Sequence, residues 1–92
     1  MSALRLEVTG ELDLATAPPL LDRVRAATAD QPAAIVLDLA GVFFCDSSGI
    51  NALIDAQSYA AARGIPLRVV NAQRVTRRAL EVTGVLPLLS GA

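Results

Sequence analysis

Residues 35–54 have the sequence IVLDLAGVFFCDSSGINALI, which passes from one periodicity to another. Apolar side chains first alternate with a period of two, which is typical of a strand with one buried face. Beyond the short segment GVFFC, apolar residues recur at helical spacing. We therefore expect a strand over residues 33–40, a short connection, and a helix that begins after Asp46.

The sequence before this stretch predicts another strand and another helix. Residues 4–9 alternate strictly between apolar and polar side chains, and Gly10 ends the alternation. Thr16 is a suitable N-cap for a helix. Pro18 and Pro19 fit the first helical turn, where an N–H group has no partner within the helix. The helix is expected to end within the sequence DQP.

The sequence after residues 35–54 repeats the pattern once more. Gly64 suits the left-handed cap of the middle helix, and residues 67–70 form a short apolar strand. Asn71 is expected to cap a third helix, which Gly84 would close. An apolar tail follows over residues 85–92.

Strands joined by helical crossovers are expected to run parallel, with the crossovers on one side of the sheet. The strand faces agree with this arrangement. The apolar face would comprise Leu4, Leu6, Val8, Ile35, Leu37, Leu39, Leu67 and Val69. The opposite face would carry Arg5, Glu7, Asp38 and Arg68. The predicted fold is a small two-layer α/β domain with a mainly parallel sheet, spanning residues 1–92 as one domain.

Composition excludes several classes of partner. The chain has 92 residues, is 53% hydrophobic and carries eight Arg, no Lys and nine acidic residues, for a net charge of −1. Dispersed arginines on a near-neutral chain argue against nucleic-acid binding. No apolar run approaches the ~20 residues of a membrane span, and the N-terminus does not resemble a signal peptide. We therefore expect a cytoplasmic protein without membrane insertion.

The chain also lacks the residues of common catalytic and metal sites. It has no His, so neither a Ser-His-Asp arrangement nor a His-containing metal site can be built. Its one cysteine, Cys45, allows no internal disulfide and is interpreted as a small buried apolar residue. We expect no catalytic residues, no metal site and no cofactor. A hydrolase is disfavoured because no base accompanies the serines.

The segment Asp46-Ser47-Ser48-Gly49 is the candidate functional site. Asp46 can accept amide hydrogen bonds from the first helical turn. The hydroxyls of Ser47 and Ser48 would lie at the positive end of the helix, where a phosphoserine is tolerated. Gly49 would leave room for another protein to approach closely. The alternative is that these four residues are only a capping sequence.

The whole chain resembles the STAS domain, specifically the bacterial anti-sigma factor antagonists. The likeness runs from about Leu4 to Leu89 and has three landmarks in the same order. These are GELDLAT at residues 10–16, IVLDLAGVFFCDSSGINALI at residues 35–54, and GIPLRVVNAQRVTRRALEVTGV at residues 64–85.

The resemblance implies a function for this site. It assigns the phosphorylated serine of the family to Ser47, with Ser48 and Gly49 completing the loop. Gly10, Glu11, Leu12 and Asp13 match the neighbouring loop. Family members bind an anti-sigma factor kinase in their unphosphorylated form and thereby release a sigma factor. Phosphorylation ends the complex, and a metal-dependent phosphatase restores it. The implied partner-binding residues are Asp13, Asp46, Ser47, Ser48 and Gly49.

A second reading keeps the fold and makes Ser47 a contact residue that is not phosphorylated. The chain would then be a STAS interaction module, such as the cytoplasmic subunit of a lipid-transport ABC complex or a signalling scaffold. Family members usually have an additional N-terminal strand and a further C-terminal helix, and we expect this chain to lack both. The strand Leu4–Thr9 is then expected to be an open sheet edge, through which a homodimer would form.

Two other groups of residues have expected structural roles. Of the neighbours Phe43 and Phe44, we expect one in the core and one on a contact surface. Arg74, Arg77 and Arg78 are expected on the solvated outer face of the last helix.

Overall fold

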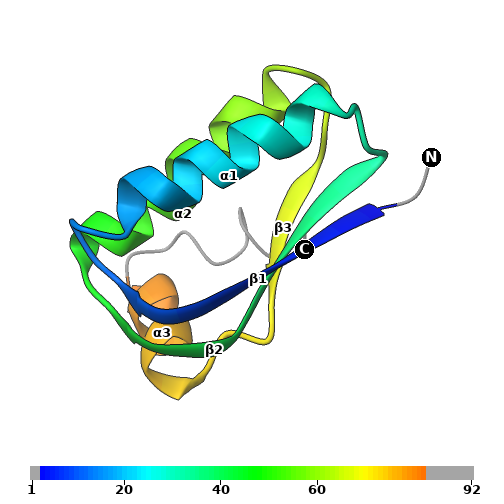
Figure 1. Cartoon of the computed structure of the whole chain (residues 1–92). Helices are drawn as coiled ribbons and strands as arrows, with labels where there is room; N and C mark the ends of the chain where they lie inside the picture. Colours follow the sequence, from blue (N-terminus) through cyan, green and yellow to red (C-terminus); the bar gives the residue numbers. More distant parts are fainter. Residues whose placement is uncertain (1–2, 83–92) are drawn as a thin grey trace.

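The computed structural model describes residues 3–82, in which strands and helices alternate along the chain (Figure 1). The strands are β1 (Ala3–Leu12), β2 (Ala34–Cys45) and β3 (Leu67–Val70). The helices are α1 (Ala17–Ala29), α2 (Ser47–Ala61) and α3 (Arg74–Val82). The order confirms the predicted alternation. The predicted end of the last helix at Gly84 and the apolar tail lie outside the described residues.

The three strands run parallel in the order β1-β2-β3. Leu37 at the centre of β2 lies beside Leu6 on β1 and Val69 on β3. α1 and α2 pack against each other on one side of this sheet, and α3 packs against β2 near its carboxyl end (Figure 1). The predicted parallel sheet with helical crossovers is therefore confirmed.

β1 and β2 extend further than the alternating pattern indicated, because β2 bulges twice against β1. The pairing shifts between Glu7 and Thr9 and again between Gly10 and Glu11. As a result, β2 uses twelve residues where β1 uses ten. The predicted strand end at Gly10 and the predicted connection at residues 41–45 are therefore wrong, since both segments belong to the paired strands. A bulge breaks the two-residue period on which those predictions relied.

The core lies between the sheet and the pair of helices α1 and α2. The largest apolar side chains that are fully buried are Leu12, Val24, Ile35, Leu37, Leu39, Val42, Leu53 and Leu80. Full burial of one such side chain stabilises the fold by roughly 2 kcal/mol. Leu4 and Leu6 are only half-buried, because they lie on β1 at the edge of the described sheet.

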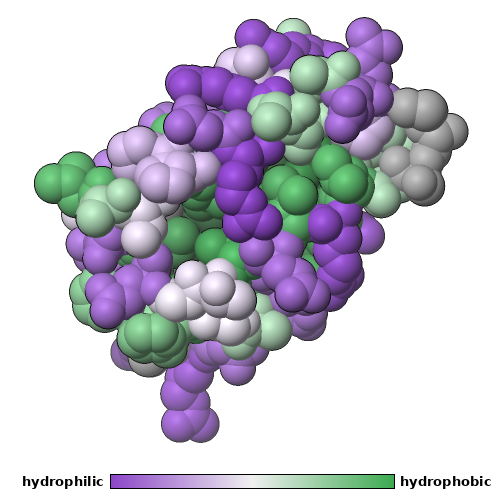
Figure 2. All heavy atoms as spheres, in the orientation of Figure 1, coloured by the Kyte–Doolittle hydropathy of each residue, from purple (hydrophilic) through white to green (hydrophobic). Residues whose placement is uncertain are grey.

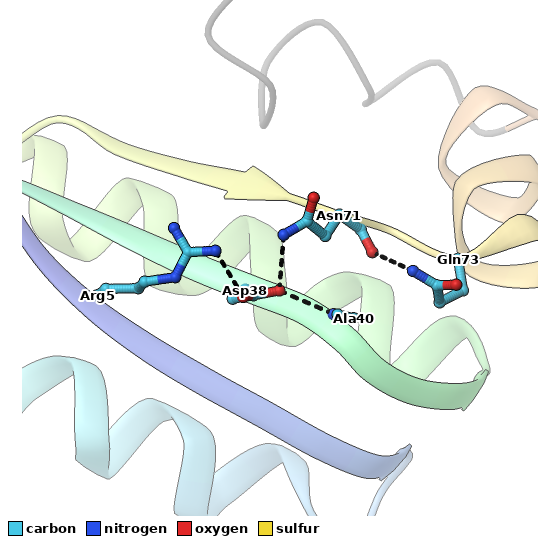
Figure 3. A network of polar contacts seen from close by, with 5 residues as sticks. All are labelled: Arg5, Asp38, Ala40, Asn71 and Gln73. Atoms are coloured by element: carbon cyan, nitrogen blue, oxygen red, sulfur yellow. Dashed lines mark hydrogen bonds and ion pairs between the residues drawn. The ribbon is translucent and has the colours of Figure 1, made fainter.

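The opposite face of the sheet carries the predicted charged residues. Asp38 on β2 accepts hydrogen bonds from Arg5 on β1 at 2.6 Å and from the Asn71 side chain beyond β3 at 3.1 Å (Figure 3). The Ala40 amide also donates to Asp38, at 3.0 Å. The Ala40 amide, followed by Arg5 and Asn71, holds the pKa of Asp38 below its ordinary value of 3.8. This network links the two edge strands to the central one.

Asn71 does not cap α3, which corrects the prediction. The helix begins at Arg74, and its first amide hydrogen bond runs from Arg77 to the Gln73 carbonyl oxygen at 2.8 Å. Asn71 instead has a positive φ of 59° and directs its side chain to Asp38. Its carbonyl oxygen accepts from the Gln73 side chain at 2.7 Å (Figure 3).

On α3, the solvent exposure of Arg74, Arg77 and Arg78 is as predicted. Thr76 is fully buried beside them in the sequence, and its hydroxyl has no hydrogen-bond partner among the residues that the structure describes. An unsatisfied buried hydroxyl costs about 1–3 kcal/mol, so α3 is held by its apolar contacts despite this cost.

Candidate functional site

Asp46 lies between β2 and α2 and is the N-cap of α2, as the sequence predicted. Its side-chain Oδ1 accepts a hydrogen bond from the Gly49 amide at 3.0 Å. Its carbonyl oxygen accepts the first helical hydrogen bond, from the Ile50 amide at 3.0 Å. The extended backbone of Asp46, with φ −102° and ψ −171°, is typical of an N-cap. The start of α2 is therefore fixed by its N-cap residue.

Ser47 is the first residue of α2 and its side chain is exposed, while Ser48 is partly exposed. The amides of both residues belong to the first turn, where no helical carbonyl oxygen is available to them. The positive end of the helix dipole adds to these free donors. The Ser47 hydroxyl is therefore accessible to a partner. The amides and the dipole would also stabilise an anionic group attached to it.

Gly49 is buried, and the crowding around it comes from this chain. A Cβ at this position would lie 2.5 Å from the Leu12 carbonyl oxygen and 2.9 Å from the Cys45 sulfur. Glycine therefore allows the first turn of α2 to press against the end of β1. The structure explains this glycine by internal packing, whereas the sequence interpretation invoked the approach of another protein. Its contact with a partner stays a prediction.

The turn after β1 lies directly beside the start of α2. The Asp46 amide donates to the Leu12 carbonyl oxygen at 3.1 Å, and Asp13 is the next residue. The predicted site residues on the two segments are thereby brought to one end of the molecule. Asp13 is partly exposed there.

Asp13 organises its own turn. Its Oδ1 accepts from the amides of Ala15 at 3.0 Å and Thr16 at 3.1 Å, and its carbonyl oxygen accepts from the Ala17 amide at 2.9 Å. The Thr16 amide is the largest cause that lowers the pKa of Asp13 from its ordinary value of 3.8. Asp13 is therefore held as a carboxylate.

Thr16 occupies the N-cap position of α1 as predicted, but its side chain makes no cap hydrogen bond to the helix. The hydroxyl instead donates to the Glu11 carbonyl oxygen at 2.8 Å and accepts from the Asp13 amide at 2.9 Å. The prolines explain why, because Pro18 and Pro19 have no N–H to donate to a cap. Hydrogen bonds in both directions between Thr16 and Asp13 thus hold the turn in place.

Large apolar side chains are exposed in the turn after β1 and near the carboxyl end of β2. Leu14 is 77% exposed, Phe43 68% and Phe44 44%. The prediction that one phenylalanine lies in the core is wrong, because the second bulge of β2 directs both outward between the buried Val42 and Cys45. The sequence analysis did not single out Leu14, although a leucine inside a capped turn is a signal that could have identified it.

Cys45 is buried immediately before the site, as predicted. Burial, followed by the charge of Asp46, raises the pKa of its thiol to about 11. The thiol therefore stays protonated at neutral pH and contributes packing. Among residues 3–82, no group of three or more acidic or cysteine side chains could hold a metal ion. None of the described helices is long and apolar enough to cross a membrane.

Comparison with known proteins gives the same family from sequence and from structure. The sequence matches the family described as "Mlab, STAS domain" over residues 1–90. It is 36% identical over 79 residues to the anti-sigma-F factor antagonist RsfB of Mycobacterium tuberculosis. That alignment covers 86% of this chain, which spans about 64% of the length of this curated relative.

Two solved structures share the fold. An anti-sigma factor antagonist from Mycobacterium paratuberculosis superposes with a TM-score of 0.80 at 33% identity, covering 91% of this chain and 71% of the other. A sulfate transporter family protein from Wolinella succinogenes superposes with a TM-score of 0.78 at 22% identity, covering 97% and 72%. The second likeness shows the fold alone. The family match over residues 1–90 and the relative at 36% identity confirm the resemblance, and this chain is a member of the STAS domain family.

Proposed function

We propose that this chain is an anti-sigma factor antagonist whose binding is controlled by phosphorylation of Ser47. The unphosphorylated chain binds an anti-sigma factor with serine kinase activity, and this binding frees a sigma factor in the cytoplasm. The chain is a substrate of enzymes and not itself an enzyme. Two relatives named as anti-sigma factor antagonists support the role. The observation that carries the proposal is the exposed hydroxyl of Ser47 at the first position of α2.

The covalent step needs groups that the kinase supplies. The Ser47 oxygen forms a bond to the γ-phosphorus of ATP, the bond between that phosphorus and ADP breaks, and a base of the kinase takes the hydroxyl proton. A metal-dependent phosphatase, with water as the second substrate, restores the hydroxyl. No cofactor bound to this chain takes part.

A phosphoryl group on Ser47 is compatible with the folded state. The free amides of the first turn and the helix dipole both favour an anion there. Phosphorylation instead weakens the binding of the partner, because the phosphate adds ~1.5–2 negative charges beside Asp46 and the Asp13 turn. A partner surface that fits a neutral hydroxyl then meets an anionic cluster.

The exposed apolar side chains supply contact area for the same partner. Leu14 follows Asp13 in the turn, and Phe43 and Phe44 precede the cap of α2 on β2. Large exposed apolar side chains that gather in one region are typical of protein interfaces. We infer that they surround the contact made by Asp13, Asp46, Ser47, Ser48 and Gly49.

A second candidate keeps this surface without phosphorylation. In it, the chain is an interaction module of a larger assembly, such as a lipid-transport complex or a scaffold, and Ser47 is only a contact. The fold also occurs in a sulfate transporter family protein, so it is not confined to anti-sigma factor antagonists.

Intact mass spectrometry with a purified cognate anti-sigma factor, Mg²⁺ and ATP distinguishes the two candidates. A pull-down from the source cell with the wild-type chain identifies that factor. The wild type and Ser48→Ala should each gain one phosphoryl group, and Ser47→Ala should gain none. Phosphorylation of the Ser47→Ala variant would show that the acceptor is another residue. An unmodified wild type, with a permease ATPase in the pull-down, would favour the second candidate.

A further inference from the structure

β1 is an edge strand of the sheet that the described residues form. Within residues 3–82 it pairs with β2 alone, and it is ten residues long. The outer side of an edge strand presents N–H and C=O groups that can pair with another strand. A long open edge of this kind is therefore a template for strand addition.

The pairing on the inner side determines which groups point outward. The Ile35 amide donates to the Pro66 carbonyl oxygen at 2.8 Å, on the β3 side of β2. Val36, the next residue, therefore directs its backbone groups toward β1, where it lies opposite Arg5. In a parallel ladder, the residue opposite such a position directs its own groups away. The outward N–H and C=O groups of β1 are thus those of Arg5 and, two residues on, Glu7.

The side chains of β1 differ between its two faces. Leu4 and Leu6 are half-buried on the helix side of the sheet, as is Leu21 of α1. Figure 2 shows apolar surface between α1 and β1 on the face turned to the viewer. Arg5 and Glu7 are exposed on the other face. The strand therefore offers an apolar row on one face and two opposite charges on the other.

We propose that β1 pairs in antiparallel orientation with β1 of a second copy of this chain, about a twofold axis at Leu6. Leu6 then faces Leu6 of the second copy, and Leu4 faces Val8 of the second copy. Arg5 lies opposite Glu7 of the second copy, and the symmetry makes this ion pair twice. A twofold axis at Arg5 or at Glu7 would instead place like charges opposite each other, which is unfavourable.

The hydrogen-bonding pattern agrees with this register. Antiparallel strands alternate between pairs that exchange both backbone hydrogen bonds and pairs that exchange none. The outward groups of Arg5 and Glu7 form the bonded pairs, and Leu6 falls at a non-bonded pair. The Arg5 side chain remains 54% exposed despite its bond to Asp38, and its guanidinium has further donors for Glu7 of the second copy.

Sedimentation equilibrium of the whole chain over a range of concentrations tests the proposal. The wild type should shift from one to two chains as concentration rises. Glu7→Arg should weaken this association roughly tenfold, because two attractive pairs become repulsive. A mixture of Glu7→Arg and Arg5→Glu should associate again, since the charges are then complementary. Arg68→Glu on the far strand is the matched control and should behave as the wild type.

Cross-linking gives a second readout if a charge variant folds poorly. Under mild oxidation by air and copper, Leu6→Cys should form a covalent dimer, because the two substituted positions face each other. Leu4→Cys should not, since Leu4 faces Val8 of the second copy. A monomer mass that is independent of concentration would overturn the proposal. A dimer that responds to Arg68→Glu and not to Glu7→Arg would also overturn it.

Discussion

The two ends of α2 differ in shape, charge and contacts. At the start, Asp46 caps the helix, Ser47 is exposed, and the Asp46 amide bonds the Leu12 carbonyl oxygen at the end of β1. Beyond the end, the Arg63 guanidinium lies 3.5 Å from the centre of the Tyr59 ring, and a hollow of about 690 Å³ opens beside both. The hollow therefore lies at the opposite end of the helix from the candidate site.

This difference shows why hollow size is a poor guide to the site in this protein. The Arg63 side chain donates to the Tyr59 carbonyl oxygen at 3.1 Å and stacks on its ring, and Arg25 lies 5.6 Å from the same ring centre. A cationic side chain that hydrogen-bonds a carbonyl oxygen of the last helical turn stabilises the helix end, so Arg63 has a structural role already. The start of α2 offers free amides and an exposed surface, which suit a protein partner and a phosphate.

The largest expected effect is on partner binding, and it compares two exposed serines of the same helix. Ser47→Asp should weaken binding of the cognate anti-sigma factor about a hundredfold, or ~2.7 kcal/mol, because it places a charge where the partner fits a hydroxyl. Isothermal titration calorimetry measures this. Ser58→Asp near the other end of α2 is the control and should bind as the wild type. Equal loss in both variants would mean that the two ends do not differ in function.

The two glycines at the ends of α2 should differ in their contribution to stability. Gly49→Ala should lower the free energy of unfolding by about 2–3 kcal/mol, because the new Cβ overlaps the Leu12 backbone. Gly64→Ala should cost about 1 kcal/mol, since Gly64 has φ +74° but no atoms within 4 Å of the added carbon. Urea unfolding measures both. A smaller loss for Gly49→Ala than for Gly64→Ala would contradict the close approach of α2 to β1.

The polar contacts at the two ends of α2 should contribute less to the free energy of unfolding than the close packing at Gly49. Asp46→Ala should lower the free energy of unfolding by about 1 kcal/mol through loss of the cap, and Asp46→Asn should retain most of that contribution. Arg63→Ala should cost about 0.5 kcal/mol, because its contact with Tyr59 is exposed. Thermal unfolding followed by circular dichroism ranks the three variants. A larger loss of stability for Arg63→Ala than for Asp46→Ala would contradict the prediction that the cap contributes more than the Arg63 contact.

Acid should lower the stability of the protein through Asp13, whose turn lies beside the start of α2. The folded-state pKa of Asp13 is lowered, so its contribution to stability is present above the ordinary value of 3.8 and is lost as pH falls through the lowered value. NMR titration of the Asp13 carboxyl carbon should report a pKa below 3.8. Asp13→Asn should flatten the fall in stability below about pH 4. A titration at or above the ordinary value would show that the turn does not hold the carboxylate.

The sequence was sufficient for the order of elements and the cap of α2, because these depend on local signals that agree. Alternation over residues 4–9 and a short apolar run over residues 67–70 predicted strands, and Asp46 before an apolar helix predicted the start of that helix. Parallel pairing then followed from the helical connections.

The remaining features depend on residues that are distant in the chain. The two bulges exist only in the pairing of β2 with β1, so the exposure of Phe43 and Phe44 could not be derived from β2 alone. The need for glycine at position 49 arises from Leu12, and Asn71 is directed away from α3 by Asp38. The predictions for the phenylalanines and for Asn71 failed because a tertiary contact overrode a local preference, and the packing at Gly49 could not be seen from the local sequence.

The close approach of α2 to the end of β1 has a mechanical consequence. With Gly49 wedged against Leu12 and Cys45, the first turn of the helix cannot tilt to absorb a new group on its surface. A phosphate on Ser47 would leave the scaffold in place and alter only what a neighbour encounters. The speed of such a signal would then be set by the phosphorylation and dephosphorylation steps and by how fast partners bind and dissociate, without a slow rearrangement inside this domain.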